Sequence, residues 1–266
     1  MRRQIVETAR AGGAKAGNLL RESLQWEILV AMHGAEAFRE VAFVGGTCLR
    51  LMYGLKRFSE DLDFSAKQPG GVTFLEDLPR GLGRFLDSRG FADAEVVLGK
   101  SHGAVRSLWV RFPGLLKEIG ASPMASQKLG IKLEFDLNPP PGADFAIQVV
   151  SSPAMMAVGL HDLPSLMSGK LHAILARSYT KGRDWYDLLW YLGRKVEPNT
   201  AFLQSALNQQ PSKFCDDAAS WKEGVRESVE AADWAAIHRD LAPFLETGGE
   251  IEMMRGEIFL AALGAK

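Results

Sequence analysis

The sequence predicts an α+β fold: a mixed β-sheet with flanking helices in residues 1–155, followed by a helical domain in residues 156–266. Short runs between residues 40 and 141 alternate polar and apolar positions, which is typical of strands, and glycine and proline clusters separate them. Before and after that region the apolar residues recur at helical spacing. A chain of 266 residues is long enough to bury a large core in such an arrangement.

Composition excludes several classes of protein. Hydrophobic residues make up 47% and charged residues 24%, as in an ordinary globular protein. The net charge of −1 means that any attraction for nucleic acid must come from a local patch. Cys48 and Cys215 lie too far apart in sequence to suggest a disulfide framework or a cysteine metal site. No signal-peptide pattern and no run of about 18 apolar residues is present, so we expect a cytoplasmic protein without a membrane partner.

The N-terminal elements follow from changes of period. Residues 1–38 are predicted to be helical, because their apolar side chains lie on one helical face. The valine-containing run at residues 40–46 predicts a buried strand that ends at Gly45 and Gly46. Thr47 is then placed to cap the helix that follows.

The remaining strands come next along the chain. The segment Asp-Leu-Asp-Phe-Ser at residues 61–65 alternates, so Asp61 and Asp63 share one strand face. An amphipathic helix is predicted at residues 74–89. Three further strands are predicted at residues 91–99, 104–114 and 128–138, and prolines 139–141 end the last of them. From about residue 160 the period is helical, with Pro164 near the start of the first helix.

Three carboxylates stand out as candidate metal ligands. Two aspartates at positions i and i+2 of a strand repel each other unless a cation lies between them. Mg²⁺ suits such a pair, because it binds one or two carboxylates and completes its shell with water and phosphate oxygens. Glu134 lies on a separate alternating strand and would complete the site if the two strands are neighbours. Asp61, Asp63 and Glu134 are therefore our predicted metal ligands and catalytic residues.

The residues upstream suggest a triphosphate site. Backbone N–H groups at Gly45, Gly46 and the following helix N-terminus can face phosphate oxygens without a Cβ in the way. Thr47 or Ser59 would add a hydroxyl, and Arg57 would offset phosphate charge. Two metal ions in such a site would assist attack at the α-phosphorus and departure of pyrophosphate.

Each pattern also has a simpler interpretation. An isolated Asp-x-Asp is compatible with a solvated strand edge, and an isolated Gly-Gly pair with an ordinary turn. Asp136 shares the face of Glu134 but precedes the proline-rich turn, so it can simply be solvated. The five histidines have no spacing typical of a metal site. Only the combination and order of the motifs favour the nucleotide site.

At this point the sequence resembles a known family. The stretch from Val44 to Phe64 resembles the first motif of the AbiEii/AbiGii toxin family, within the DNA polymerase beta-like nucleotidyltransferases. Members pair Gly-Gly-Thr with a downstream Arg-x-Ser-x-Asp-x-Asp-Phe, and Lys132 with Glu134 is similar to their second motif. The resemblance runs over about residues 40–195 and implies a nucleotidyltransferase-like mixed sheet. Residues 1–38 and 197–266 lie outside it.

The helical region after residue 160 also resembles the family. A lysine in a Lys-Leu-x-Ala helix followed by Arg-Asp-x-x-Asp gives Lys170, Arg183, Asp184 and Asp187. The resemblance implies that Lys132 and Lys170 bind the nucleotide and that Lys170 and Asp184 take part in catalysis. An interhelix salt bridge between the lysine and the aspartates is the alternative.

The resemblance implies a metal-dependent transfer of NMP from an NTP to an acceptor, with Mg²⁺ or Mn²⁺. It also implies the toxin of a type IV toxin–antitoxin or abortive-infection pair, with tRNA 3′ ends as the expected acceptor and a separately encoded or kinase-like antitoxin as partner. Three alternatives stay open: a small-molecule acceptor such as an antibiotic, an Asp-x-Asp glycosyltransferase, and a non-catalytic nucleotide-binding module.

Overall fold

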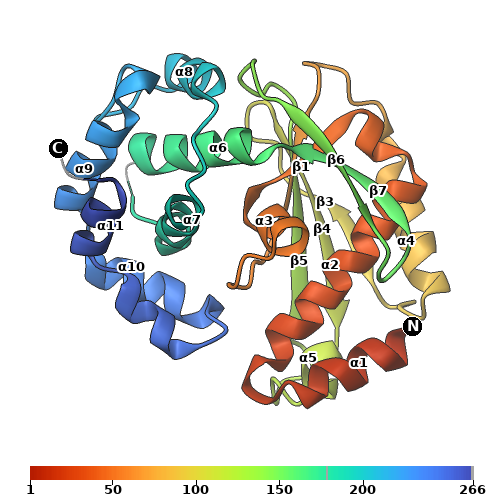
Figure 1. Cartoon of the computed structure of the whole chain (residues 1–266). Coiled ribbons are helices and arrows are strands. Elements are labelled where there is room, and N and C mark those ends of the chain that lie inside the picture. The colour runs from red at the N-terminus through yellow and green to blue at the C-terminus, as the bar shows by residue number, and fades with distance from the viewer. Residues whose placement is uncertain (178, 265–266) are drawn as a thin grey trace. The chain divides into compact units, whose positions relative to one another are not determined.

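The computed structural model describes residues 1–177 and 179–264, and the chain divides into two compact units (Figure 1). Unit 1 comprises residues 1–48, 58–139 and 147–160. Unit 2 comprises residues 49–57, 140–146 and 161–266. Neither unit is continuous in sequence, because the chain returns to each of them.

Unit 1 is built on a mixed sheet. Within the described residues, the sheet has seven strands in the order β3-β4-β5-β2-β1-β7-β6. Strands β2 and β5 are parallel, as are β1 and β7, whereas β1/β2, β3/β4 and β4/β5 are antiparallel. The strands are β1 (Val41–Val44), β2 (Leu62–Ala66), β3 (Glu95–Leu98), β4 (Val105–Pro113), β5 (Lys128–Asp136), β6 (Phe145–Val150) and β7 (Met156–His161).

The sequence analysis predicts the first five of these strands but not the last two. Strand β6 exposes its apolar side chains, including Ile147 and Val149, so its alternation does not follow burial. Strand β7 is a short apolar run containing Gly159, and such a run does not distinguish a strand from a helix by period. Both strands take their conformation from their place in the sheet.

One face of the β4–β5–β2 region forms the core of unit 1. Three phenylalanines of these strands contact rings from the segments that cover this face. The pairs are Phe64 with Phe38, Phe112 with Phe91, and Phe135 with Phe74. Helix α2 crosses in front of these strands (Figure 1), and α4 packs against β3. The helices of this unit are α1 (Arg2–Ala11), α2 (Ala16–Gly34), α4 (Leu78–Ser88) and α5 (Leu115–Glu118). The prediction of helices within residues 1–38 is confirmed. The helix predicted at residues 74–89 is present over residues 78–88 and follows a 3₁₀ turn at residues 74–76.

The other face of the same strands is partly exposed and carries polar side chains. Along β5 every second residue is buried, and the residues between them are at least partly exposed. Asp63, Trp109, Lys132 and Glu134 belong to this half-buried face. The alternation therefore separates an apolar side that packs on helices from a side that carries polar groups.

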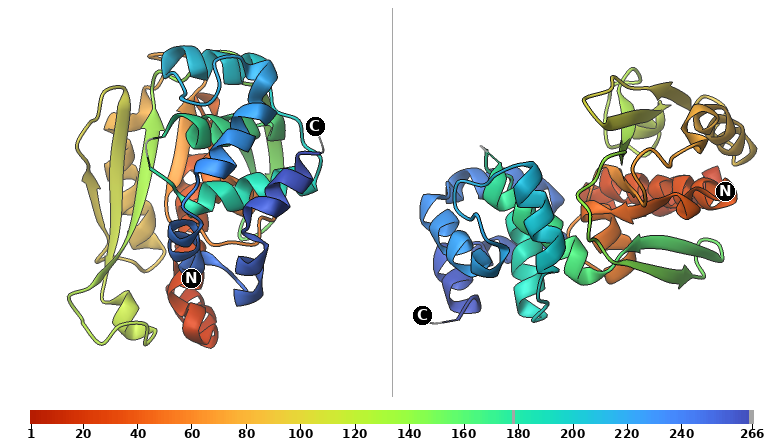
Figure 2. Two further views of the ribbon diagram at one scale, coloured as in Figure 1. Left: turned by 90° about the vertical axis from the view of Figure 1, so that its left-hand side faces the viewer. Right: turned by 90° about the horizontal axis from the view of Figure 1, so that it is seen from above.

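Unit 2 is helical. Asp162 caps its first helix by accepting a hydrogen bond from the Ser165 N–H, and Pro164 lies in the first turn, as predicted. Trp185, Trp234 and Phe259 form an aromatic cluster in the core of this unit. The helices can be followed in two further views (Figure 2). The helices after β7 are α6 (Leu163–Ala176), α7 (Gly182–Gly193), α8 (Thr200–Gln209), α9 (Trp221–Ala231), α10 (Trp234–Leu241) and α11 (Gly256–Ala262).

Within the described residues, no helix combines the length and the apolar character that crossing a membrane requires.

Candidate functional site

The sheet register brings two of the predicted acids together. Asp63 of β2 is paired with Glu134 on the parallel neighbour β5. Paired residues on adjacent strands lie about 5 Å apart, and their side chains project from the same face. Asp61 comes two residues before Asp63, just ahead of β2, and all three acids are half-buried. The condition on which Glu134 could join the two aspartates, that the two strands are neighbours, is therefore met.

Gly45 lies directly against Asp63. Its φ of +79° is unfavourable for other residues, and a Cβ placed on it would lie 2.2 Å from Asp63 Oδ2. Gly45 is also the first residue of α3 (Gly45–Tyr53), so the beginning of this helix adjoins an acid of the cluster. Burial, together with the negative charge of Asp63, raises the pKa of the neighbouring Cys48 thiol.

Thr47 has a different local role from the predicted one. Helix α3 already begins at Gly45, so Thr47 lies within its first turn and is not the N-cap. Its buried hydroxyl donates a hydrogen bond to the Asp61 carbonyl oxygen, which connects the helix to the acidic segment. Gly46 is buried as the second residue of α3. The helix starts early because a glycine with a positive φ turns the chain directly from strand to helix.

The segment ahead of β2 is held by a buried glutamine. Gln25 on α2 donates hydrogen bonds from Nε2 to the carbonyl oxygens of Ser59 and Glu60, at 3.1 and 2.9 Å. Ser59 itself is half-buried. Together with Thr47, Gln25 fixes the backbone that carries Asp61.

The acid group has donors that suit a divalent cation. Carboxylate oxygens are the ligands that Mg²⁺ prefers, and Gly45 gives Asp63 room close to a helix N-terminus. Lys132 Nζ donates to Glu134 Oε1 at 2.6 Å. No three His, Cys, Asp or Glu side chains in the described part of the chain are grouped as ready metal ligands. Asp61 and Asp63 are the residues that would hold a cation here, with Glu134 beside Asp63 and paired to Lys132.

Asp136 is engaged locally. Its Oδ1 accepts a hydrogen bond from the Asn138 N–H at 3.0 Å, at the turn that follows β5. This contact gives the carboxylate a role in the turn, which the sequence interpretation of a simply solvated side chain did not include.

A second cluster of predicted residues lies in unit 2. Arg57 donates from Nε and Nη2 to the two carboxylate oxygens of Asp187, at 2.7 and 2.6 Å. Lys170 on α6 contacts Asp184 at 2.8 Å and Asp187 at 2.9 Å, both on α7. Arg177 also pairs with Asp184. The interhelix salt bridge that was the alternative interpretation of these residues is therefore present.

Charge balance in this cluster is reflected in the pKa values. Burial by itself would raise the pKa of Asp184, but Lys170 and Arg177 outweigh it and lower the value to about 2. Burial would likewise lower the pKa of Lys170, and the carboxylates of Asp184 and Asp187 raise it instead. Arg57 follows the same logic, with its pKa raised through Asp187 despite burial. These three groups are therefore charged near neutral pH.

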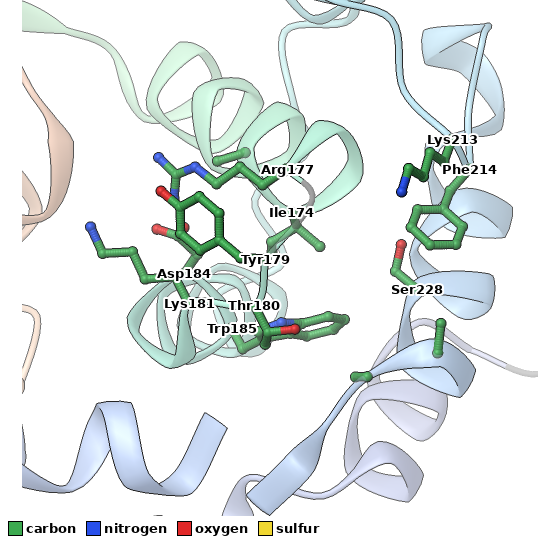
Figure 3. Close-up of a pocket in the computed structure, with 13 residues that line it drawn as sticks. Ile174, Arg177, Tyr179, Thr180, Lys181, Asp184, Trp185, Lys213, Phe214 and Ser228 are labelled. Carbon is green, nitrogen blue, oxygen red and sulfur yellow. The ribbon is translucent and has the colours of Figure 1, made fainter. Parts of the chain in front are cut away.

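A cavity of about 140 Å³ adjoins this second cluster. Figure 3 shows Arg177, Tyr179 and Asp184 grouped on one wall, with Lys213 and Phe214 on the opposite wall. Lys181 also lines it, and burial, followed by the charge of Arg183, lowers the pKa of this lysine. The sequence analysis does not single out Lys181 or Lys213, although Lys181 stands directly before α7, where a cation gains nothing from the helix dipole.

The structure thus sorts the predicted residues into two groups, each within one unit. The first contains Gly45, Gly46, Thr47, Ser59, Asp61, Asp63, Lys132 and Glu134 in unit 1. The second contains Arg57, Lys170, Arg183, Asp184 and Asp187 in unit 2.

Comparison with known proteins gives consistent results. The model of the family described as nucleotidyl transferase AbiEii toxin, type IV TA system, matches residues 27–257, well beyond the residues that carry the sequence resemblance. JHP933 from Helicobacter pylori is similar in fold, with a TM-score of 0.54 and 18% identity over 92% of this chain and 91% of that chain. A second H. pylori protein, provisionally assigned as a nucleotidyltransferase, has a TM-score of 0.51 and 16% identity over 89% and 92%. No curated protein matches the chain.

Proposed function

The chain belongs to the AbiEii nucleotidyltransferase toxins of type IV toxin–antitoxin systems, and on this basis we propose that it transfers NMP from an NTP to the 3′ end of a tRNA in a Mg²⁺-dependent reaction. The observation that carries this proposal is the register of Asp63 with Glu134, combined with the contact between Gly45 and Asp63. Together they join two acids to a helix N-terminus on one sheet face.

The residues of unit 1 divide the work as follows. Backbone N–H groups at the beginning of α3 would face phosphate oxygens beside Asp63, whose carboxylate occupies the space that Gly45 leaves free of a Cβ. The Asp61 and Asp63 carboxylates hold the divalent cation, which supplies charge neutralisation at the phosphates when bound. Thr47 and Gln25 keep the Asp61 backbone in place.

The transfer itself balances without a further reactant. The acceptor hydroxyl oxygen forms a bond to the α-phosphorus, and the bond between that phosphorus and the bridging oxygen of the β-phosphate breaks. Pyrophosphate leaves, and the hydroxyl proton passes to a carboxylate of the acid group. Glu134 is the proposed acceptor of this proton, and Lys132 holds the Glu134 carboxylate in position through its hydrogen bond.

For Lys170 and Asp184 we propose a role in nucleotide use in addition to the ion pairs that they form. The burial of Asp184 and its pairing with the half-buried Lys170 support the structural part of that role. The nucleotide part would appear as a change in the KM for NTP that is separate from any change in stability.

The experiment is a transfer assay with α-³²P-labelled NTPs, each in turn, and total tRNA. We expect label on tRNA with Mg²⁺, and loss of label with a chelator or with Asp61→Ala or Asp63→Ala. Label on a small molecule would mean that the acceptor is that molecule and not tRNA. Transfer of a sugar from UDP-sugars would indicate a glycosyltransferase. Wild-type transfer by Asp61→Ala would contradict the metal assignment.

A further inference from the structure

Trp109 lies on the same sheet face as the proposed catalytic acids. In the antiparallel pair β4/β5, Ser107 is the partner of Glu134 and Trp109 is the partner of Lys132. Asp63, Glu134 and Ser107 therefore form one row across three strands, and Trp109 occupies the next row on that face. Residues two apart along a strand are separated by about 7 Å, so the indole is one nucleotide-sized step from the acids.

The Trp109 indole lies against a glycine of the neighbouring strand, Gly130, which has no side chain. Gly130 of β5 is the partner of Arg111, diagonal to Trp109, and a Cβ on Gly130 would lie 3.2 Å from Cζ3 of the indole. Any larger residue there would push the ring away. Trp109 is nevertheless half-buried, whereas Trp185 and Trp221 are buried in the core of unit 2. Part of the indole surface is consequently open to solvent.

Arg111 supplies a cation beside this ring. Its guanidinium carbon is 5.5 Å from the centroid of the Trp109 ring. Lys132 and Lys128, on the same face, are paired with Glu134 and Glu95. Among the described residues, the Arg111 guanidinium has no hydrogen-bond or ion-pair partner, and its contact is with the Trp109 ring. Of the three cations named on this part of the face, Arg111 is therefore the one whose charge is not already paired with a carboxylate.

The sheet order places this pair on a particular side of the acids. Gly45 follows β1, on one side of β2, whereas Trp109 is on β4, beyond β5 on the other side. The acids of β2 and β5 thus lie between the proposed phosphate site and the indole. A group that approaches along β4 meets the acids from the side opposite the triphosphate, which is the side that an acceptor must use.

We propose that Trp109 and Arg111 bind the unpaired end of a nucleic-acid acceptor, with a base stacked on the indole and a backbone phosphate at the guanidinium. This inference rests on the proposed function for the role of the bound strand, but not for the binding itself. Sheets that bind single-stranded nucleic acid use aromatic rings and cations in this way, because every base has a face for stacking and every nucleotide carries a phosphate. Because the net charge of −1 gives the chain no general attraction for nucleic acid, the attraction comes locally, from the Arg111 guanidinium.

A purely structural arginine–tryptophan pair is the competing interpretation, and the chain contains a matched example of one. Trp190 on α7 is also half-buried, with the guanidinium carbon of Arg194 4.3 Å from its ring centroid, but it lies in unit 2 and on a helix. Trp190→Ala is therefore the control for Trp109→Ala.

The experiment measures binding of a short fluorescent single-stranded RNA by anisotropy, with the full chain throughout. We expect Trp109→Ala to raise the Kd roughly fivefold to tenfold or more, since one stacked base contributes that much, and Trp109→Phe to retain most of the binding. Arg111→Ala should weaken binding and reduce the salt dependence by about one phosphate contact. Trp190→Ala should leave the Kd unchanged. Thermal unfolding of each variant checks the fold, and Trp109→Phe keeps the test valid if Trp109→Ala does not fold.

A kinetic arm distinguishes the acceptor from the nucleotide. Trp109→Phe and Arg111→Ala should raise the KM for tRNA and leave the KM for NTP unchanged. An unchanged Kd and tRNA KM, an equal loss in Trp190→Ala, an effect on the NTP KM alone, or a wild-type chain that binds no RNA would each overturn the inference. RNA binding that requires Trp109 without any nucleotide transfer would support the inference and remove the proposed function. Transfer to a small molecule without RNA binding would overturn the inference and replace tRNA as the acceptor, while the nucleotidyltransferase activity itself would stand.

Discussion

Arg57 and Asp187 form a fully buried, two-bond ion pair although 130 positions separate them in the sequence. The side chain of Asp187 is 0% exposed and that of Arg57 is 2% exposed. A guanidinium and a carboxylate match each other in such a geometry, and the pairing compensates the cost of removing both charges from water.

Removing one partner should therefore be severely destabilising. Asp187→Asn leaves the Arg57 charge buried with only the weaker compensation of its other neighbours, and we expect a loss of about 3–5 kcal/mol in the free energy of unfolding. Urea denaturation measures it. The exposed pair Arg39–Glu36 is the control, and Glu36→Ala should change stability by less than about 1 kcal/mol. Similar losses in both variants would mean that burial does not set the strength of the Arg57 pair.

Gly45 and Gly54 allow backbone strain to be separated from the contact with Asp63. Both have a positive φ, +79° and +75°, but a Cβ at Gly54 would meet nothing within 4 Å. Alanine at either position should cost about 1–2 kcal/mol of stability. Gly45→Ala should in addition abolish nucleotide transfer because it displaces Asp63, and Gly54→Ala should transfer at the wild-type rate when measured well below its unfolding temperature. Equal activity of the two variants would count against a role for the Gly45 contact.

Glu134 and Asp136 share one face of β5 and differ in their contacts. Glu134 is beside Asp63, whereas the Asp136 carboxylate serves the turn at Asn138. Glu134→Gln should lower kcat by about a hundredfold or more, because a positioned general base contributes about 10²- to 10⁴-fold, while Asp136→Asn should stay within about threefold of wild type. Single-turnover transfer rates decide between them, and a larger effect at Asp136 would reverse the assignment.

Lys170 has two proposed roles that respond to different measurements. In Lys170→Met, Asp187 keeps Arg57 and Asp184 keeps Arg177, so the fold should persist with reduced stability. If the ammonium also serves the nucleotide, the KM for NTP should rise by tenfold or more, since hydrogen bonds to charged groups contribute about 1.5–3 kcal/mol. Reduced stability with an unchanged KM and kcat would leave Lys170 with the interhelix role alone.

His161 should make the protein sensitive to mild acid. It is buried between the rings of Phe145 and Phe202, and burial, opposed only in part by Asp162, lowers its pKa from 6.5 to about 4. Between these two values the unfolded chain binds a proton that the folded chain does not. Stability should therefore fall as pH decreases from 6.5 to 4, by about 3 kcal/mol at most from this group.

The difference between variants isolates the contribution of His161. His161→Phe keeps a ring in the aromatic stack, and its unfolding free energy should vary less with pH over that range. His102 is exposed, so His102→Asn should follow the wild-type curve. Parallel curves for wild type and His161→Phe would assign the acid sensitivity to other groups.

The sequence by itself determined those features that depend on near neighbours. A period of two puts Lys132 and Glu134 on one side of β5, as the structure has them. The same period predicts a shared strand face for Asp61 and Asp63, but β2 begins at Leu62 and Asp61 lies just ahead of it. Glycine at position 45 was informative for the same reason, because only a local conformation is involved. The order of these motifs along the chain suggested the family, and the family model that matches residues 27–257 shows the membership.

Only the tertiary structure decided which of these local elements meet. Strand register places Glu134 beside Asp63 and Trp109 in the next row, and register depends on pairings between segments about 70 residues apart in the case of β2 and β5. The partner of Arg57 could not be read from the sequence either, because several buried carboxylates are chemically equivalent until packing selects one. Local backbone preference is carried by each residue, whereas pairing and burial are properties of the whole fold.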